Sequence, residues 1–173
     1  MRISRRRFLT YISAGVGLTV SAVVGTHFIT TRTRGTPEGL AIYLDAYDDT
    51  LELWPIPYEE LDIITRFGTT HIIVSGPRDA PPLVLLHPNS TSSTVWFPNI
   101  ADWSQNYRTY AIDIIGEPGK SVVTNLPKNR IECAKWLEAL FDKLEIEKAP
   151  IIGGSYGGFH TTNFAIKKPE RVK

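Results

Sequence analysis

Short apolar runs, separated by turns and by amphipathic stretches, alternate along the chain from about residue 54 to its end. Two of these runs, residues 61–67 and 71–75, flank Gly68-Thr69-Thr70, a sequence typical of a hairpin turn. Three later runs are apolar rather than alternating, as parallel strands covered on both faces usually are. These later runs are residues 83–86, 109–115 and 150–152.

Two helices are predicted among the later runs. Residues 130–144 repeat apolar side chains at three- and four-residue spacing, which predicts an amphipathic helix with one face on a sheet. The apolar positions are Ile131, Ala134, Leu137, Phe141 and Leu144. Asn129 is placed to cap this helix, and Glu132 completes a capping-box-like start. A second helix is expected over residues 156–168, before Pro169. A hairpin followed by strand–helix alternation predicts an α/β fold with a mostly parallel sheet.

The segment before residue 54 follows no such alternation. Residues 30–39 are rich in Thr, Arg, Gly and Pro, and we interpret them as an exposed connector. Residues 41–53 are compatible with a short helix. We therefore divide the chain into an N-terminal segment over residues 1–29, a linker and extension over residues 30–53, and an α/β domain over residues 54–173.

The amino-acid composition excludes some classes of binding partner and some kinds of site. The chain has 173 residues, a formal net charge of +1 and 21% charged residues, which describes one globular domain without electrostatic attraction to nucleic acid. Its single cysteine, Cys133, excludes a disulfide within the chain and a cysteine-only metal site. We interpret Cys133 as a half-buried helix residue.

Residues 4–10, Ser-Arg-Arg-Arg-Phe-Leu-Thr, precede an uncharged, weakly apolar stretch over residues 11–24 that is rich in Gly, Ser and Thr. This combination is typical of a targeting segment. It resembles the bacterial twin-arginine signal, Ser-Arg-Arg-x-Phe-Leu-Lys, with Thr10 in the last position. The resemblance implies export by the twin-arginine machinery to the far side of the cytoplasmic membrane. An uncleaved membrane anchor over residues 11–30 is the alternative, and cleavage is left open.

Gly119-Lys120-Ser121 matches the end of a phosphate-binding P-loop. A P-loop also needs a glycine five residues before Gly119, where this chain has Ile114, and a helix directly after the serine. Residues 122–127 are instead rich in β-branched side chains and end in proline. We therefore expect no nucleotide binding at this loop and interpret Lys120 as a solvated loop residue.

Residues 150–160, PIIGGSYGGFH, contain a Gly-x-Ser-x-Gly motif between a predicted strand and a predicted helix. This context is the one that a nucleophile elbow requires. Small residues flank Ser155 because so sharp a turn brings the backbone against its neighbours. The backbone N–H of Tyr156 is then expected to face the oxygen that becomes negative when Ser155 attacks a carbonyl.

Several further stretches extend this likeness. They are TRFGTTHIIVSGP (65–77), PPLVLLHPNSTSSTVWFPNI (81–100), DIIGEPGKS (113–121) and KKPERV (167–172). Together with the elbow, they resemble the α/β-hydrolases, and most closely the bacterial carboxylesterases, from about residue 54 to residue 173. The resemblance implies the N-terminal part of an α/β-hydrolase fold, with an opening antiparallel hairpin, a mostly parallel sheet and helices on both faces.

The resemblance also implies a chemistry. It implies ester hydrolysis through an acyl-enzyme on Ser155, without a cofactor, and with the N–H groups of Tyr156 and Asn89 binding the oxyanion. The family usually has His-Gly where this chain has His87-Pro88. Amide, lactone and carbon–carbon bond hydrolysis on the same fold stay open.

The base that should activate Ser155 is not found in the sequence. In this family the order along the chain is serine, acid, histidine. His160 is expected to be structural, Asp113 to cap a turn, and none of His27, His71 and His87 occupies the position of the base. We therefore expect a truncated chain whose acid and base follow residue 173. A catalytically silent fragment of the hydrolase fold, tethered at the membrane, is the alternative from another class.

Overall fold

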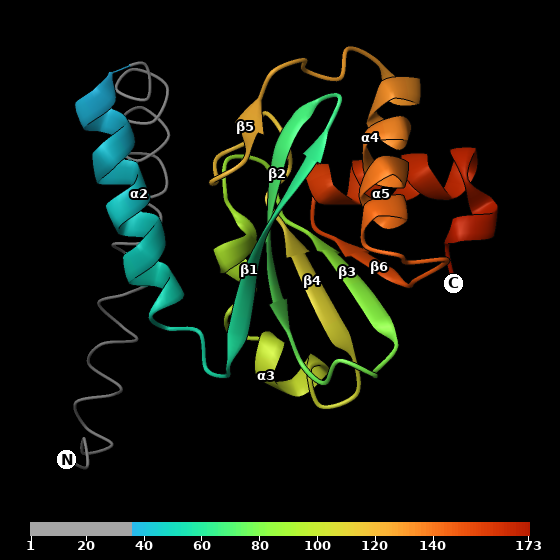
Figure 1. Ribbon diagram of the computed structural model, residues 1–173, viewed down its shortest axis with the longest axis horizontal. Helices are drawn as coiled ribbons and strands as arrows, with labels where there is room; N and C mark the ends of the chain where they lie inside the picture. The colour runs from blue at the N-terminus through green and yellow to red at the C-terminus, as the bar shows by residue number, and fades with distance from the viewer. Residues whose placement is uncertain (1–35) are drawn as a thin grey trace. The chain divides into compact units, whose positions relative to one another are not determined.

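The structure is a computed structural model that describes residues 36–173 (Figure 1). The chain divides into two compact units, residues 1–45 and 46–173. Helix α2 (Pro37–Leu51) runs through the boundary between them. It includes residues 41–51 of the helix considered for residues 41–53, but it begins inside the segment that we interpret as a connector. Thr36 caps it, since the Thr36 hydroxyl accepts the N–H of Gly39 at 3.1 Å.

The signal or anchor predicted over residues 1–29 lies outside the described residues. Within residues 36–173, no helix has both the length and the apolar composition needed to cross a membrane.

A six-stranded mixed sheet forms the centre of the second unit, in the order β1-β2-β4-β3-β6, with β5 paired to β2 (Figure 1). Its strands are β1 (Tyr58–Thr65), β2 (Gly68–Ser75), β3 (Pro82–Leu86), β4 (Arg108–Ile112), β5 (Val122–Val123) and β6 (Ile151–Gly153). Strands β3, β4 and β6 are parallel, while β2 is antiparallel to its neighbours. The predicted strands and the opening hairpin are confirmed, whereas β5 was not predicted because two exposed residues carry no pattern.

The hairpin turn lies two residues earlier than predicted. Thr65 pairs with Gly68, so Arg66 and Phe67 form the turn and residues 68–70 belong to β2. The sequence pattern places the apolar Phe67 in the first strand. In the structure Phe67 belongs to the turn, and its side chain is nevertheless buried. Gly68 has a φ of 130°, and a Cβ there would meet the carbonyl oxygen of Val122 at 2.1 Å. This glycine is therefore required both by its positive φ at the end of the turn and by the close approach of β5.

Helices α4 (Arg130–Lys143) and α5 (Tyr156–Lys167) cover one face of the sheet. Trp136 is fully buried there, and its indole N–H donates to the Thr70 hydroxyl at 3.0 Å. The strand residues on this face belong to the main core and include Ile72, Val74, Val84, Leu86 and Ile112. Alternate residues such as Ile73 and Leu85 are equally buried on the other face. Both faces are covered, as the apolar strand runs predicted.

The start of α4 and most of its apolar stripe are as predicted, but Ile131 does not belong to the stripe and Trp136 does. The Asn129 side chain accepts the N–H groups of Ile131 and Glu132, both at 3.0 Å. The side chain of Ile131, expected in the stripe, is 55% exposed. The buried positions are Cys133, Ala134, Trp136, Leu137, Leu140 and Phe141. The large Trp136 side chain lies at the centre of this set, so the helix faces the sheet along Trp136 rather than along Ile131.

The C-terminal residues lead back to the sheet. Helix α5 ends before Pro169, which begins the short 3-10 helix η2 (Pro169–Arg171). Val172 then pairs with Ala149 in an isolated parallel bridge, next to the start of β6.

Candidate active site

Ser155 lies in a sharp turn between β6 and α5, with φ 47° and ψ −107°. Residues other than glycine seldom have a positive φ, because their Cβ then crowds the backbone. Ser155 is exposed, and no hydrogen bond within residues 36–173 engages its hydroxyl. The turn therefore presents the Ser155 hydroxyl to solvent at the carboxyl end of the central strands.

The glycines around Ser155 allow this turn. A Cβ on Gly157 would lie 2.0 Å from the carbonyl oxygen of Leu86, and a Cβ on Gly153 would lie 2.4 Å from the backbone of Gly157. Both distances are far shorter than van der Waals contact, so neither position has room for a side chain. The close approach of α5 to β3 and β6 thus explains the glycines that the sequence motif predicted.

Tyr156 is the first residue of α5. The N–H groups in the first turn of a helix have no partner within the helix, and the dipole of the helix is positive there. In the part of the chain that the structure describes, the Tyr156 N–H has no hydrogen-bond acceptor. It is thus available for an anion next to Ser155.

The loop after β3 begins with a buried histidine. The Nε2 atom of His87 accepts the N–H of Ile114 at 2.9 Å, and its Nδ1 lies 2.8 Å from the carbonyl oxygen of Pro88. Nδ1 must therefore carry the proton of a neutral ring. Burial lowers the pKa of His87, which favours the same neutral form. His87 joins the ends of β3 and β4 and is structural.

Pro88 brings this loop against the elbow. A Cβ on Gly154 would lie 3.0 Å from Cγ of the Pro88 ring. The next residue, Asn89, is exposed, and its backbone N–H has no acceptor within residues 36–173. This chain has Pro88 where the family usually has glycine. The backbone N–H of Asn89 is nevertheless available near the elbow.

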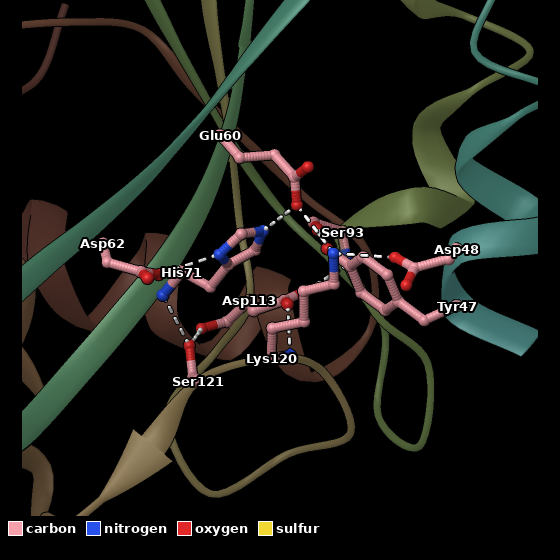
Figure 2. Close-up of polar contacts among 9 residues, drawn as sticks. All are labelled: Tyr47, Asp48, Glu60, Asp62, His71, Ser93, Asp113, Lys120 and Ser121. Carbon is pink, nitrogen blue, oxygen red and sulfur yellow. Dashed lines mark hydrogen bonds and ion pairs between the residues drawn. The ribbon is translucent and has the colours of Figure 1, made fainter. Parts of the chain in front are cut away.

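Asp113 ties together the two loops that follow β3 and β4 (Figure 2). Its side chain is fully buried and accepts the N–H groups of Ser93 and Lys120, each at 2.7 Å. The Ser121 hydroxyl donates to the Asp113 carbonyl at 2.7 Å and accepts the His71 N–H at 2.9 Å. Asp113 therefore organises the loops, in agreement with its interpretation as a turn-capping residue.

Lys120 is not the solvated residue that we predicted. Its Nζ atom lies 2.7 Å from carboxylate oxygens of Glu60 and Asp48 and 4.8 Å from the centroid of the Tyr47 ring (Figure 2). Burial by itself would lower the pKa of Lys120, but the two carboxylates raise it. These partners come from β1 and the last turn of α2, so no local pattern indicated them. After Ser121 the chain forms β5 instead of the helix that a P-loop needs.

The other described histidines do not contact Ser155. His160 is buried on α5, where its ring lies edge-on to the rings of Tyr156 and Trp136. Burial, with a smaller effect from His87, lowers the pKa of His160 to about 4. In the strand β2, Nδ1 of His71 lies 2.9 Å from the carboxylate of Asp62. These contacts support the structural interpretation of His160, while His27 lies outside the described residues.

The described residues offer no metal site. Among residues 36–173, no cluster of three or more His, Cys, Asp or Glu side chains could hold a metal ion. What the site does offer is a hydroxyl on a strained turn and two unengaged N–H groups. Such a combination suits nucleophilic attack on a carbonyl followed by stabilisation of the resulting oxyanion.

Comparison with known proteins identifies the fold. Residues 81–173 match the family described as the alpha/beta hydrolase fold. The chain belongs to the alpha/beta hydrolase fold family. This confirms the resemblance drawn from the elbow and the loops after β3 and β4, and the fold class that it implied.

Two curated proteins named carboxylesterases are similar to the chain. The uncharacterized carboxylesterase nap of Bacillus subtilis (strain 168) is 56% identical over 131 residues, which are 76% of this chain and 44% of that protein. The carboxylesterase YbfK of the same organism is 50% identical over 135 residues, which are 78% of this chain and 45% of that protein.

A solved structure of the same family has the same fold. The crystal structure of naproxen esterase (carboxylesterase NP) from Bacillus subtilis aligns with a TM-score of 0.77 and 54% identity, over 80% of this chain and 48% of that one. The chain thus spans less than half the length of these hydrolase relatives.

Glu117 is one residue near the site that sequence reasoning missed. Its carboxylate accepts the N–H of Ser90, 27 residues away along the chain, at 2.8 Å. Glu117 lies in the loop after β4, whose Gly-Lys-Ser sequence suggests phosphate binding and gives no sign of a contact with the loop after β3. Only its charge at the predicted turn could have drawn attention to it.

Proposed function

We propose that the protein is a serine hydrolase that cleaves carboxylic esters through an acyl-enzyme on Ser155. The observation that carries the proposal is the strained, exposed Ser155 with the unengaged N–H of Tyr156 beside it. The similarity to proteins named carboxylesterases favours esters among the bonds that this fold can cleave.

The reaction would take place in two steps. The Ser155 oxygen attacks the ester carbonyl while its proton passes to a base, and the backbone N–H groups of Tyr156 and Asn89 bind the oxygen that gains negative charge. The alcohol then leaves with that proton, and water hydrolyses the acyl-enzyme to release the acid and restore the serine. Asn89 takes part in this step through its backbone N–H. The Asn89 side chain is not itself a donor to the oxyanion.

The base and the acid belong to the proposal as well. His71, His87 and His160 have other contacts, and no hydrogen bond within the described residues joins them to Ser155. We therefore propose that a histidine and a carboxylate outside this sequence complete the triad. No cofactor is needed for this chemistry.

The experiment is a comparison of the full-length protein with its Ser155→Ala variant. The wild type should hydrolyse a p-nitrophenyl ester of a short acid and react covalently with a fluorophosphonate probe. Ser155→Ala should lose both properties, because no oxygen nucleophile remains at the elbow. Thr162→Ala, which removes an exposed hydroxyl from the same helix, should keep both.

The second candidate function is a catalytically silent fragment of the fold, and it rests on the contacts that occupy the described histidines. It predicts that the chain of 173 residues, purified alone, hydrolyses the ester no faster than its Ser155→Ala variant. Turnover by this chain above that control would exclude the silent fragment.

We also propose that residues 1–29 direct export by the twin-arginine machinery, on the strength of Arg5, Arg6 and Phe8 in the signal-like pattern. Replacing Arg5 and Arg6 by lysine should retain the protein in the cytoplasm, while Arg7→Lys should leave export unchanged. Export of the double variant at the wild-type level would contradict this targeting.

A further inference from the structure

The tip of the loop after β3 is held by the carboxylate of Glu117. The backbone N–H of Ser90 donates to Oε2 of Glu117 at 2.8 Å. We assign the Asn89 amide the orientation that satisfies its neighbours, in which its nitrogen donates to both Glu117 oxygens at 3.1 Å and its oxygen accepts the Ser90 hydroxyl at 3.0 Å. One carboxylate therefore holds the backbone of Ser90 and the side chain of Asn89 together.

The backbone at this tip needs such support. Ser90 has a φ of 61°, in the left-handed region that residues other than glycine seldom adopt. A hydrogen bond from a backbone N–H to a charged carboxylate is stronger than one to a neutral acceptor, so it offsets part of the strain. Without Glu117, an exposed loop of this kind would have several conformations of similar energy.

The other side of the tip is held independently. The carbonyl oxygen of Pro88 accepts hydrogen bonds from Nδ1 of His87 and from the Thr91 hydroxyl, each at 2.8 Å. Asn89 thus lies between the anchored carbonyl of Pro88 and the anchored N–H of Ser90. Its own backbone N–H has no acceptor within residues 36–173, so its direction is set by these two anchors.

The negative charge of Glu117 also affects the pKa values of Tyr156 and His87. Burial is the main cause of the raised pKa of Tyr156, and the negative charge of Glu117 raises it further. The same charge opposes the effect of burial on the pKa of His87.

On the basis of the proposed esterase function, we propose that Glu117 is a positioning residue that holds the Asn89 N–H where the ester carbonyl oxygen gains negative charge. Glu117 would not stabilise the oxyanion by its own charge, because a carboxylate repels a developing anion. Its contribution is geometric. A neutral side chain with the same shape and hydrogen-bonding atoms should therefore replace it.

The test compares Glu117→Ala with Glu117→Gln in the full-length enzyme. A misplaced group at a reacting centre can cost about 100-fold in rate, and loss of one oxyanion donor costs about 100-fold or more. We expect Glu117→Ala to lower kcat by about 10- to 100-fold and to change KM by less than about threefold. Glu117→Gln should stay within about threefold of wild type, since its amide can accept the Ser90 N–H and donate to the Asn89 oxygen.

A matched control and a second variant exclude a loss of folding as the cause. Glu147→Ala removes an exposed glutamate outside the site and should leave kcat and KM unchanged. Asn89→Ala keeps the backbone N–H but loses the contact with Glu117, so it should lower kcat less than Glu117→Ala does. Combining it with Glu117→Ala should add little further loss, because both changes break the same contact.

Each result bears on the inference. A kcat of Glu117→Ala within about twofold of wild type, a loss confined to KM, or a Glu117→Gln variant as impaired as Glu117→Ala would each overturn the positioning role. A Ser155-dependent activity in the same assay shows that such a failure concerns Glu117 alone. Absence of Ser155-dependent activity in the wild type would overturn the proposed function together with this inference.

Discussion

The carboxylate of Asp113 accepts the backbone N–H of Ser93 at 2.7 Å, across 20 residues of sequence. Its second oxygen accepts the N–H of Lys120, so one buried side chain fixes both loops that follow β3 and β4. The hydroxyl of Ser93 is in turn 2.9 Å from that of Tyr47, in the last turn of α2 (Figure 2). The site is thus connected to the end of α2 through a short chain of hydrogen bonds.

Replacing Asp113 by asparagine should destabilise the protein. The asparagine oxygen can accept one of the two N–H groups, but its NH₂ would face the other donor and leave a buried polar group unpaired. Such a group costs about 1–3 kcal/mol. Urea unfolding of Asp113→Asn should show a loss in this range, whereas Asp79→Asn, at an exposed position, should match the wild type.

Two glycines of α5 should respond differently to alanine. A Cβ on Gly157 would lie 2.0 Å from the Leu86 carbonyl oxygen, and one on Gly158 would lie 3.3 Å from the Gly153 carbonyl oxygen. Gly157→Ala should therefore lower the free energy of unfolding by about 3 kcal/mol through overpacking. Gly158→Ala should stay within about 1 kcal/mol of wild type, because alanine also favours the helix. Equal stability of the two variants would contradict the geometry of the elbow.

His160 should make stability depend on pH. Its pKa is about 4 in the folded protein, against an ordinary value of 6.5, because burial disfavours the charged ring. The unfolded chain therefore binds a proton more readily, and the stabilisation present above pH 6.5 is lost as the pH falls towards 4. The difference in pKa corresponds to on the order of 3 kcal/mol.

The measurement is the urea midpoint of the wild type and of His160→Gln at several pH values between 7.5 and 4. The wild type should lose more stability over this interval than the variant, which keeps only the contributions of His87 and other groups. Parallel pH profiles for the two proteins would show that His160 is not buried in its neutral form.

Lys120 should contribute to stability through charge rather than through packing. Lys120→Met keeps an unbranched side chain over the Tyr47 ring but leaves Glu60 and Asp48 without their cation. These carboxylates are partly exposed, so we expect a loss of about 1 kcal/mol at low salt that becomes smaller in 1 M salt. Lys148→Met, at an exposed position without such a pair, should show neither effect.

Local sequence patterns determined the type and the approximate limits of the main elements. Asn129 caps α4 through N–H groups two and three residues away, so the neighbouring sequence contains all of the information. The elbow is predictable for the same reason, since Gly153, Ser155 and Gly157 lie within five residues. Membership of the hydrolase family followed from these stretches, because a short motif keeps its spacing wherever the fold places it.

Tertiary packing decided what local patterns could not. Ile131 and Trp136 both fit an apolar stripe, and only the sheet beneath α4 determines which of them is buried. Lys120 lies beside Glu60, 60 residues away, because β1 and the loop after β4 meet in space. The same holds for Glu117 and Ser90. The sequence by itself determined the elements and the motif that presents Ser155, whereas the contacts that orient the loops around Ser155 depend on packing between segments far apart in the chain.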